Sequence, residues 1–97
     1  MSPIKNESTE KLFKAILNLS SIDECYDFFD DLCTIKELMD MSQRFETAIL
    51  LLEGKSYQQI AAEIGVSTAT TGRVAKCLNY GSGGYQKAIA SLEDSDE

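Results

Sequence analysis

The stretch from Ser56 to Leu78, SYQQIAAEIGVSTATTGRVAKCL, decides the fold of this 97-residue chain. Its apolar spacing and small residues fit two short helices packed across a tight turn, which is a helix-turn-helix. Ala61 lets the second helix approach the first, Gly65 supplies the left-handed turn, and Val66 fills the elbow. The pattern predicts a motif that binds in the DNA major groove. The alternative is a plain helical hairpin without a nucleic-acid role.

Helical periodicity continues on both sides of this stretch. Apolar residues recur every three or four positions, and Thr34 followed by Glu37 is a capping box that opens a long helix. The chain is therefore expected to be all-α, a single domain over residues 1–97 with about six helices. The expected segments are helices at 9–19, from Ser21 onward and from Thr34 to Glu53, the helix-turn-helix at 54–79 with helices over 57–64 and 68–79, a flexible connector at 81–84, a short helix at 85–92 and an acidic tail at 93–97.

The net charge of the chain is -7, and its uneven distribution matters more than its total. Residues 54–88 hold four basic residues against Glu63 alone, whereas residues 1–53 hold five basic and eleven acidic residues and residues 89–97 hold four acids. The stretch with a positive balance is thus the one that contains the helix-turn-helix, and DNA is expected to face that end. Its basic residues are Lys55, Arg73, Lys76 and Lys87.

No metal, cofactor or catalytic site is expected. The chain has no His, and Cys25, Cys33 and Cys77 lack zinc-ligand spacing, so buried reduced thiols are the simpler interpretation. The acids between residues 23 and 31 fit a solvated helix face better than a metal or acid-base cluster. The glycines at 81–84 have no preceding strand and no following Lys-Ser/Thr pair, which argues against a phosphate-binding loop. Since no nucleophile has a visible base, we do not expect an enzyme.

The sequence also carries no sign of export or membrane insertion. The first ten residues are polar, and the longest apolar run, Ile49 to Leu52, is far too short to span a bilayer. We therefore expect no signal peptide, no membrane segment and a cytoplasmic location.

Six motifs occur in order between Leu32 and Gly81: TIKEL, SQRFE, LLEGKSYQQI, GVSTAT, RV and CLNYG. In this order and spacing the chain resembles the Trp repressor family, most closely its YerC/YecD-type branch, over nearly its full length. The resemblance implies an intertwined homodimer, in which dimerisation helices within residues 9–53 of both subunits build one core and two helix-turn-helix heads project from it. A second subunit would also cover Leu50 and Leu51, which extend the apolar character around the long helix.

The resemblance also implies how DNA is bound. Each head places its second helix in one of two successive major grooves, about 34 Å apart, on a palindromic operator in double-stranded DNA. Thr68 and Thr70 are expected to bond phosphates or base edges, and Ala69 to touch a thymine methyl. With few cations in each head, the salt dependence of binding is expected to be shallow. The residues expected to face DNA are Lys55, Gln58, Gln59, Ser67, Thr68, Ala69, Thr70, Gly72, Arg73 and Lys76.

A candidate effector pocket follows from the same resemblance. Thr34, Arg44 and Arg73 stand where the tryptophan-binding member of the family has pocket residues. That member has Gly immediately after the second arginine, whereas this chain has Val74, whose branched side chain fills the space that the ligand needs. The sequence therefore predicts that tryptophan does not bind in the same manner, and it leaves open whether another small molecule binds.

Two residues are expected to weaken the second helix of the helix-turn-helix, over residues 68–79. Thr71 stands where helix-turn-helix proteins usually bury Ile or Val, so its hydroxyl needs a partner such as the carbonyl of Ser67. Gly72 beside it is a weak helix former. The sequence as a whole predicts a DNA-binding transcriptional regulator, with an acidic helical protein-interaction module as the alternative. The operator, the pathway and the sign of regulation are left open.

Overall fold

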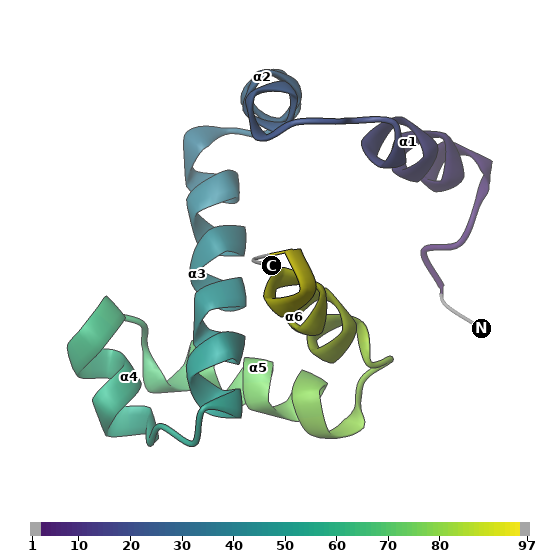
Figure 1. Cartoon of the computed structure of the whole chain (residues 1–97). Coiled ribbons are helices and arrows are strands. Elements are labelled where there is room, and N and C mark those ends of the chain that lie inside the picture. The colour runs from purple at the N-terminus through teal and green to yellow at the C-terminus, as the bar shows by residue number, and fades with distance from the viewer. Residues whose placement is uncertain (1–2, 96–97) are drawn as a thin grey trace. The chain divides into compact units, whose positions relative to one another are not determined.

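The computed structural model describes the backbone of residues 3–95 and the side chains of residues 3–93. This part of the chain contains six α-helices and no strand (Figure 1), so the prediction of an all-α fold is confirmed. The chain divides into two compact units, and the division falls between Leu38 and Met39. The single domain expected over residues 1–97 stays a prediction. The helices are α1 (Glu7–Leu17), α2 (Ile22–Leu32), α3 (Ile35–Leu52), α4 (Tyr57–Ile64), α5 (Thr68–Tyr80) and α6 (Gly84–Ser95).

Helix α1 begins earlier than its apolar stripe suggested. The side-chain oxygen of Asn6 accepts a hydrogen bond from the backbone N–H of Thr9 (2.9 Å), which makes Asn6 the N-cap, and Asn18 caps the other end. The predicted range 9–19 is therefore wrong by two residues at each end. The reason is that Asn6 and Asn18 fix the ends of the helix, whereas the prediction relied on the apolar residues between them.

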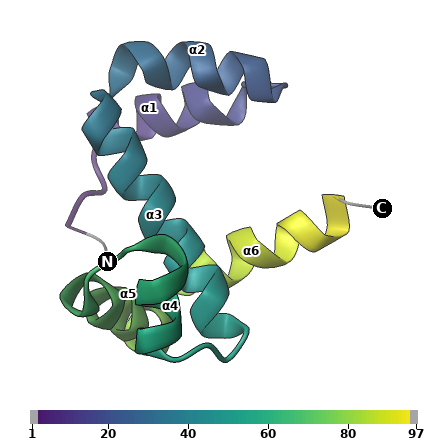
Figure 2. The ribbon, with the colours of Figure 1, turned by 90° about the vertical axis from the view of Figure 1, so that its left-hand side faces the viewer.

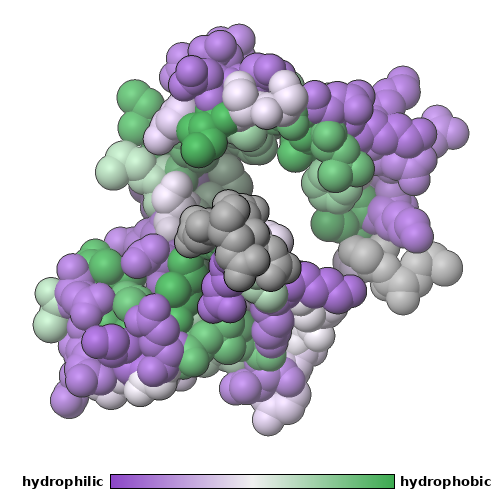
Figure 3. Space-filling view, in the orientation of Figure 1, coloured by the Kyte–Doolittle hydropathy of each residue, from purple (hydrophilic) through white to green (hydrophobic). Residues whose placement is uncertain are grey.

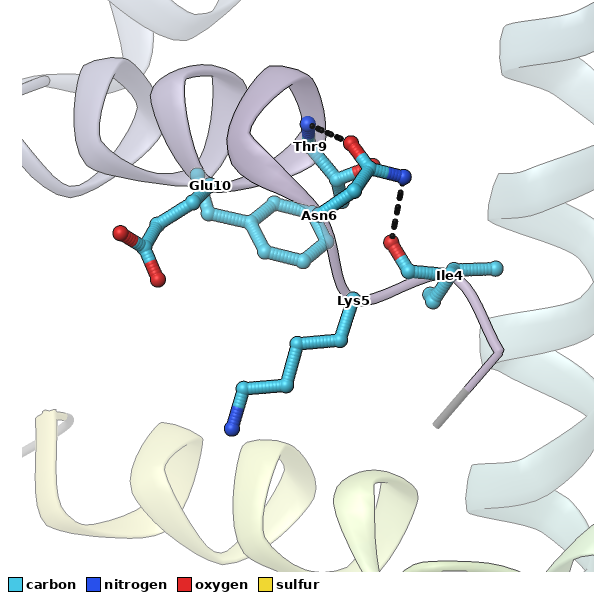
Figure 4. Close-up of a pocket in the computed structure, with 6 residues that line it drawn as sticks. Ile4, Lys5, Asn6, Thr9 and Glu10 are labelled. Carbon is cyan, nitrogen blue, oxygen red and sulfur yellow. Dashed lines mark hydrogen bonds between the residues drawn. The ribbon is translucent and has the colours of Figure 1, made fainter. Parts of the chain in front are cut away.

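The cap of α1 also shapes a hollow at the start of the helix. The Asn6 side chain donates to the carbonyl oxygen of Ile4 (3.2 Å), and the hollow beside these residues measures about 240 Å³ (Figure 4). Phe13 lines the hollow, and both Phe13 and Ile4 are exposed. Apolar side chains at this end of the first unit therefore remain in contact with solvent.

Helix α2 begins at the predicted N-cap, Ser21. The hydroxyl oxygen of Ser21 accepts from the backbone N–H of Glu24 (3.1 Å). The Glu24 carboxylate in turn accepts from the hydroxyl of Ser20 (2.8 Å) and from its backbone N–H (3.3 Å). These bonds, with the Ser20 hydroxyl contributing most, hold the pKa of Glu24 below its ordinary value of 4.5.

The apolar stripes of α1 and α2 are present, but they are not buried by the chain itself. Neither helix contains a buried residue. Hydrophobic side chains lie on the surface of both helices (Figure 3). The first unit therefore leaves these stripes without a core of its own. The most exposed apolar residues at these helices and at the start of α3 are Leu17 (82 %), Ile35 (77 %), Ile22 (75 %) and Tyr26 (67 %).

Helix α3 opens with the capping box that the sequence predicted. The Thr34 hydroxyl oxygen accepts from the backbone N–H of Glu37 (3.1 Å), and the Glu37 carboxylate accepts from the backbone N–H of Thr34 (2.9 Å). This backbone bond is the main reason that the pKa of Glu37 lies below 4.5, with the Thr34 side chain as the second.

The last residue of α3 is Leu52, and Gly54 makes the turn that stops the helix, as predicted. Gly54 has φ +89°, and its N–H bonds to the carbonyl of Leu51 (3.0 Å). The next N–H, that of Lys55, bonds to the carbonyl of Leu50 (3.1 Å). This pair of bonds is a Schellman motif, which fixes the backbone at the point where the chain turns toward α4.

The core of the second unit lies between α3, α4 and the turn that leads to α5. Helices α4 and α6 lie on different sides of α3 (Figure 2). Val74 of α5 is also buried, at 1 % exposed. The buried cluster consists of Leu50, Ile60 and Val66, and the partly buried Leu51 and Ile64 pack against it.

Helix α6, within the second unit, contacts both α3 and the end of α5. The rings of Phe45 in α3 and Tyr85 in α6 lie 6.4 Å apart, centroid to centroid, and the side-chain N–H of Gln86 donates to the carbonyl of Leu78 (2.6 Å). The helix runs from Gly84 to Ser95, so the predicted range 85–92 is too short at both ends. Residues 93–95 include no Gly or Pro that would stop the helix. Residues 93–95 of the predicted tail are therefore helical, and residues 96–97 lie outside the described residues.

The three thiols are free but not buried. Cys25 and Cys77 are exposed and Cys33 is half-buried, so the prediction of buried thiols is wrong for the single chain. Cys25 lies on the uncovered α2, which explains its exposure. None of the described helices combines the length and the apolar character that crossing a membrane requires.

We expect Ser20→Ala to raise the pKa of Glu24 toward 4.5, because it removes the hydroxyl that lowers this pKa most. In the unaltered protein the charged carboxylate stabilises the start of α2 fully above 4.5, and this contribution is lost as the pH falls through the lowered pKa. An NMR titration of the side-chain carboxyl carbons measures the change, with Glu37 as the internal control. A Glu24 pKa that does not move would contradict this assignment.

Candidate nucleic-acid interface

Helices α4 and α5 meet at the turn that the sequence predicted. Gly65 follows α4 with φ +72°, and its N–H bonds to the carbonyl of Ala61 (2.9 Å). Residues with a Cβ adopt this left-handed conformation only at a cost, which explains glycine at this position. Val66, 3 % exposed, fills the elbow. Both helices coincide with their predicted ranges to within one residue.

Each helix of the motif begins at a serine cap. The Ser56 hydroxyl accepts from the N–H of Gln59 (3.1 Å), and Oε1 of Gln59 accepts from the N–H of Ser56 (2.8 Å), which completes a capping box. The Ser67 hydroxyl likewise accepts from the N–H of Thr70 (3.1 Å). Gln59 and Ser67, both predicted to face DNA, therefore also fix the starts of α4 and α5.

Hydroxyl groups link the first turn of α5. The Ser67 hydroxyl donates to Oγ1 of Thr70 (3.1 Å), and Oγ1 of Thr71 donates to the carbonyl of Ser67 (3.0 Å). Thr71 is fully buried, and the partner predicted for its hydroxyl, the carbonyl of Ser67, is present. A buried hydroxyl with this bond avoids the cost of an unsatisfied polar group, about 1–3 kcal/mol.

The residues predicted to face DNA gather on the surface of this motif. Ala69, Arg73 and Lys76 follow each other at i, i+4 and i+7, so they share one exposed face of α5. Thr71 and Val74 anchor the buried face of the same helix. The remaining predicted residues are the exposed Gln58, Gln59, Ser67 and Thr68 and the half-buried Lys55, Thr70 and Gly72.

One of the predicted phosphate contacts is already paired with an acid. Nζ of Lys55 lies 3.7 Å from Oε1 of Glu63, and the two side chains are 39 % and 51 % exposed. Sequence reasoning missed this pair, because the two residues stand eight positions apart and no helical spacing connects them. The single sequence signal was that Glu63 is the lone acid in an otherwise basic stretch.

The residues of the candidate effector pocket lie in both units. Thr34 belongs to the first unit and uses its hydroxyl in the cap of α3. In the second unit Arg44 is half-buried, Arg73 is exposed, and Val74 is 1 % exposed. The branched side chain of Val74 thus occupies the interior of this unit, and the pocket stays a prediction. Within the described residues, no group of three or more Cys, Asp or Glu side chains is placed to hold a metal ion.

A comparison with protein families decides the relationship that the motifs suggested. A family model described as Trp repressor protein matches residues 7–93. The chain belongs to the Trp repressor family. YerC of Bacillus subtilis (strain 168), itself an uncharacterized protein, is 44 % identical over 93 residues, which are 96 % of this chain and 89 % of YerC.

Solved structures of Trp repressor family proteins share the fold. A TrpR-like protein from Eubacterium eligens ATCC 27750 superposes with a TM-score of 0.89 at 49 % identity, and the match covers 93 % of both chains. A candidate Trp repressor from Staphylococcus aureus has a TM-score of 0.89 at 39 % identity over 93 % of this chain and 90 % of its own. Together with the likeness to YerC, these matches assign the chain to the TrpR-like YerC branch of the family.

Two glycine substitutions should have opposite effects on stability. A Cβ added at Gly65 or at Gly72 would meet no neighbouring atom within 4 Å. Only the backbone conformation therefore distinguishes the two positions. Gly65→Ala is expected to destabilise the protein by about 1–2 kcal/mol, because φ is positive. Gly72→Ala is expected to stabilise it by up to about 1 kcal/mol, because Gly72 lies inside α5.

Urea unfolding at one fixed protein concentration measures both changes. Amide exchange on the unaltered protein adds a second readout, since α5 is expected to be its least protected helix. Changes of the same sign in both variants would contradict this account of the turn and of α5.

Proposed function

We propose that the protein is a sequence-specific DNA-binding transcription regulator that acts as a homodimer and places α5 in the major groove. The observation that carries this proposal is the composition of α5. Its exposed face presents Ala69, Arg73 and Lys76, while its other face is held in the core by Thr71 and Val74. A helix that is anchored on one side and basic on the other suits the groove. Membership of the Trp repressor family supports the same function.

The distribution of charge supports this orientation. Residues 54–88 hold four basic residues against Glu63, in a chain whose net charge is -7. Phosphates are therefore attracted to the helix-turn-helix and repelled by the rest of the chain. Since few cations face DNA in each head, tight binding requires two heads on one DNA molecule.

The uncovered apolar faces support a homodimer. Leu17, Ile22 and Tyr26 are each at least two-thirds exposed, and α1 and α2 bury no residue. Burying apolar area stabilises an interface by roughly 25 cal/mol per Å². A second copy of the chain supplies the matching surface, as the resemblance to the Trp repressor family implies.

We infer that the protein does not bind tryptophan as the family's tryptophan-binding member does. Val74 is 1 % exposed and follows Arg73 directly, where that member has a glycine. Making room for an indole there requires moving a branched side chain out of a packed interior, and overpacking typically costs about 1–3 kcal/mol.

Selection from a pool of random DNA duplexes tests the proposed function. We expect enrichment of a palindrome whose half-sites lie about one helical turn apart, and the same sequence with and without tryptophan. If no sequence is enriched even at low salt, the proposal is wrong and an acidic protein-interaction module is favoured.

The double variant Arg73→Ala with Lys76→Ala should lose specific binding and remain a dimer. It removes both exposed cations of α5, and each lost phosphate contact lowers the salt slope by about 0.9. Binding titrations over a range of salt concentrations measure the loss, and sedimentation checks the dimer.

A matched control makes this result specific. Lys5→Ala with Lys11→Ala changes the net charge equally at two exposed residues outside residues 54–88. We expect this control to keep specific binding. If the first variant binds as well as the control, α5 does not face DNA through Arg73 and Lys76.

A further inference from the structure

The position of Lys55 is fixed by the backbone on both sides of it. Its N–H bonds to the carbonyl of Leu50 in the Schellman motif that ends α3 (3.1 Å), and Ser56, the next residue, caps α4. Lys55 therefore does not sit on a loose loop. Its side chain starts from a defined point at the N-terminal end of α4.

Glu63 supplies the anion that meets this side chain. It lies in the last turn of α4, about one helix length from Lys55, and the two side chains extend along α4 until Nζ and Oε1 are 3.7 Å apart. The helix dipole does not explain this arrangement, because it disfavours a cation at the N-terminus and an anion at the C-terminus. The pair is thus held by the mutual attraction of its charges.

DNA competes with Glu63 for the same cation. The N-terminal end of a helix attracts phosphate, and a lysine there adds to the attraction. Both side chains of the pair are partly exposed, so a phosphate can reach the ammonium group. When Lys55 turns to a phosphate, Glu63 loses its cation and keeps its negative charge beside the DNA backbone. Because the Lys55–Glu63 pair is neutral as a whole, it adds no net positive charge to the head.

We propose that Glu63 is an internal counter-ion that occupies Lys55 in the free protein and limits the DNA affinity of each head. This proposal rests on the proposed function, since it concerns the same helix-turn-helix. It assigns the single acid of residues 54–88 a role in setting the strength and salt dependence of binding.

Glu63→Gln tests the proposal. The variant is expected to bind the selected duplex up to about fivefold more tightly per head, which is the upper range for releasing an exposed ion pair. Its salt slope should become steeper by about 0.9 per head, because Lys55 then acts as a full phosphate contact. The matched control is Glu10→Gln, which breaks the exposed Lys14–Glu10 pair of α1 (3.6 Å) with the same change of charge.

A double-mutant cycle separates the release of Lys55 from a general effect of charge. In the unaltered protein, Lys55→Ala is expected to lower the DNA affinity only slightly. In the Glu63→Gln background, the same substitution is expected to lower the affinity by up to about fivefold more per head. An equal loss in both backgrounds, or a Glu63→Gln variant that matches Glu10→Gln, overturns the proposal while the function stands. If the unaltered protein binds no DNA, both are overturned.

Discussion

The arrangement of the second unit depends on the burial of Leu50, Ile60 and Val66 at one point. These side chains come from α3, α4 and the turn, so burying them together sets the angle at which α5 leaves the core. Each fully buried aliphatic side chain contributes about 1.5–3 kcal/mol, and the three together approach the whole stability of a small domain. The left-handed Gly65 makes the turn that brings Val66 to this point. The exposed face of α5 owes its direction to this small cluster.

The first unit shows the opposite situation, because its helices form without a core of their own. Local bonds define them: Asn6 caps α1, Ser21 caps α2, and Thr34 with Glu37 caps α3. Their apolar faces remain open to solvent. Capping and helix propensity thus determine the secondary structure of this unit. In the proposed homodimer, a second copy of the chain would bury these faces and place two heads on one DNA.

The sequence predicted best what short-range bonds determine. The helix-turn-helix, the end of α3 at Gly54 and the hydrogen bond of Thr71 all follow from residues within a few positions of each other, and all are present. The start of α1 was missed because the prediction followed the apolar stripe and overlooked the Asn6 cap.

Long-range features were harder to predict. The exposure of Cys25 and Cys77 was missed because a periodic stripe shows which face of a helix is apolar but not what covers it. The ion pair of Lys55 with Glu63 was missed because it depends on the direction in which two side chains extend along α4. The set of residues that faces DNA stays a prediction, since no structural feature of the free chain shows contact with a base.

The spacing of half-sites provides the most direct test of the central proposal, that two heads act together on one DNA. Five base pairs inserted between the half-sites of the selected duplex turn one of them by about half a helical turn, away from the second head. Affinity is expected to fall to that of a single half-site. Affinity that is unchanged by the insertion would contradict the proposal.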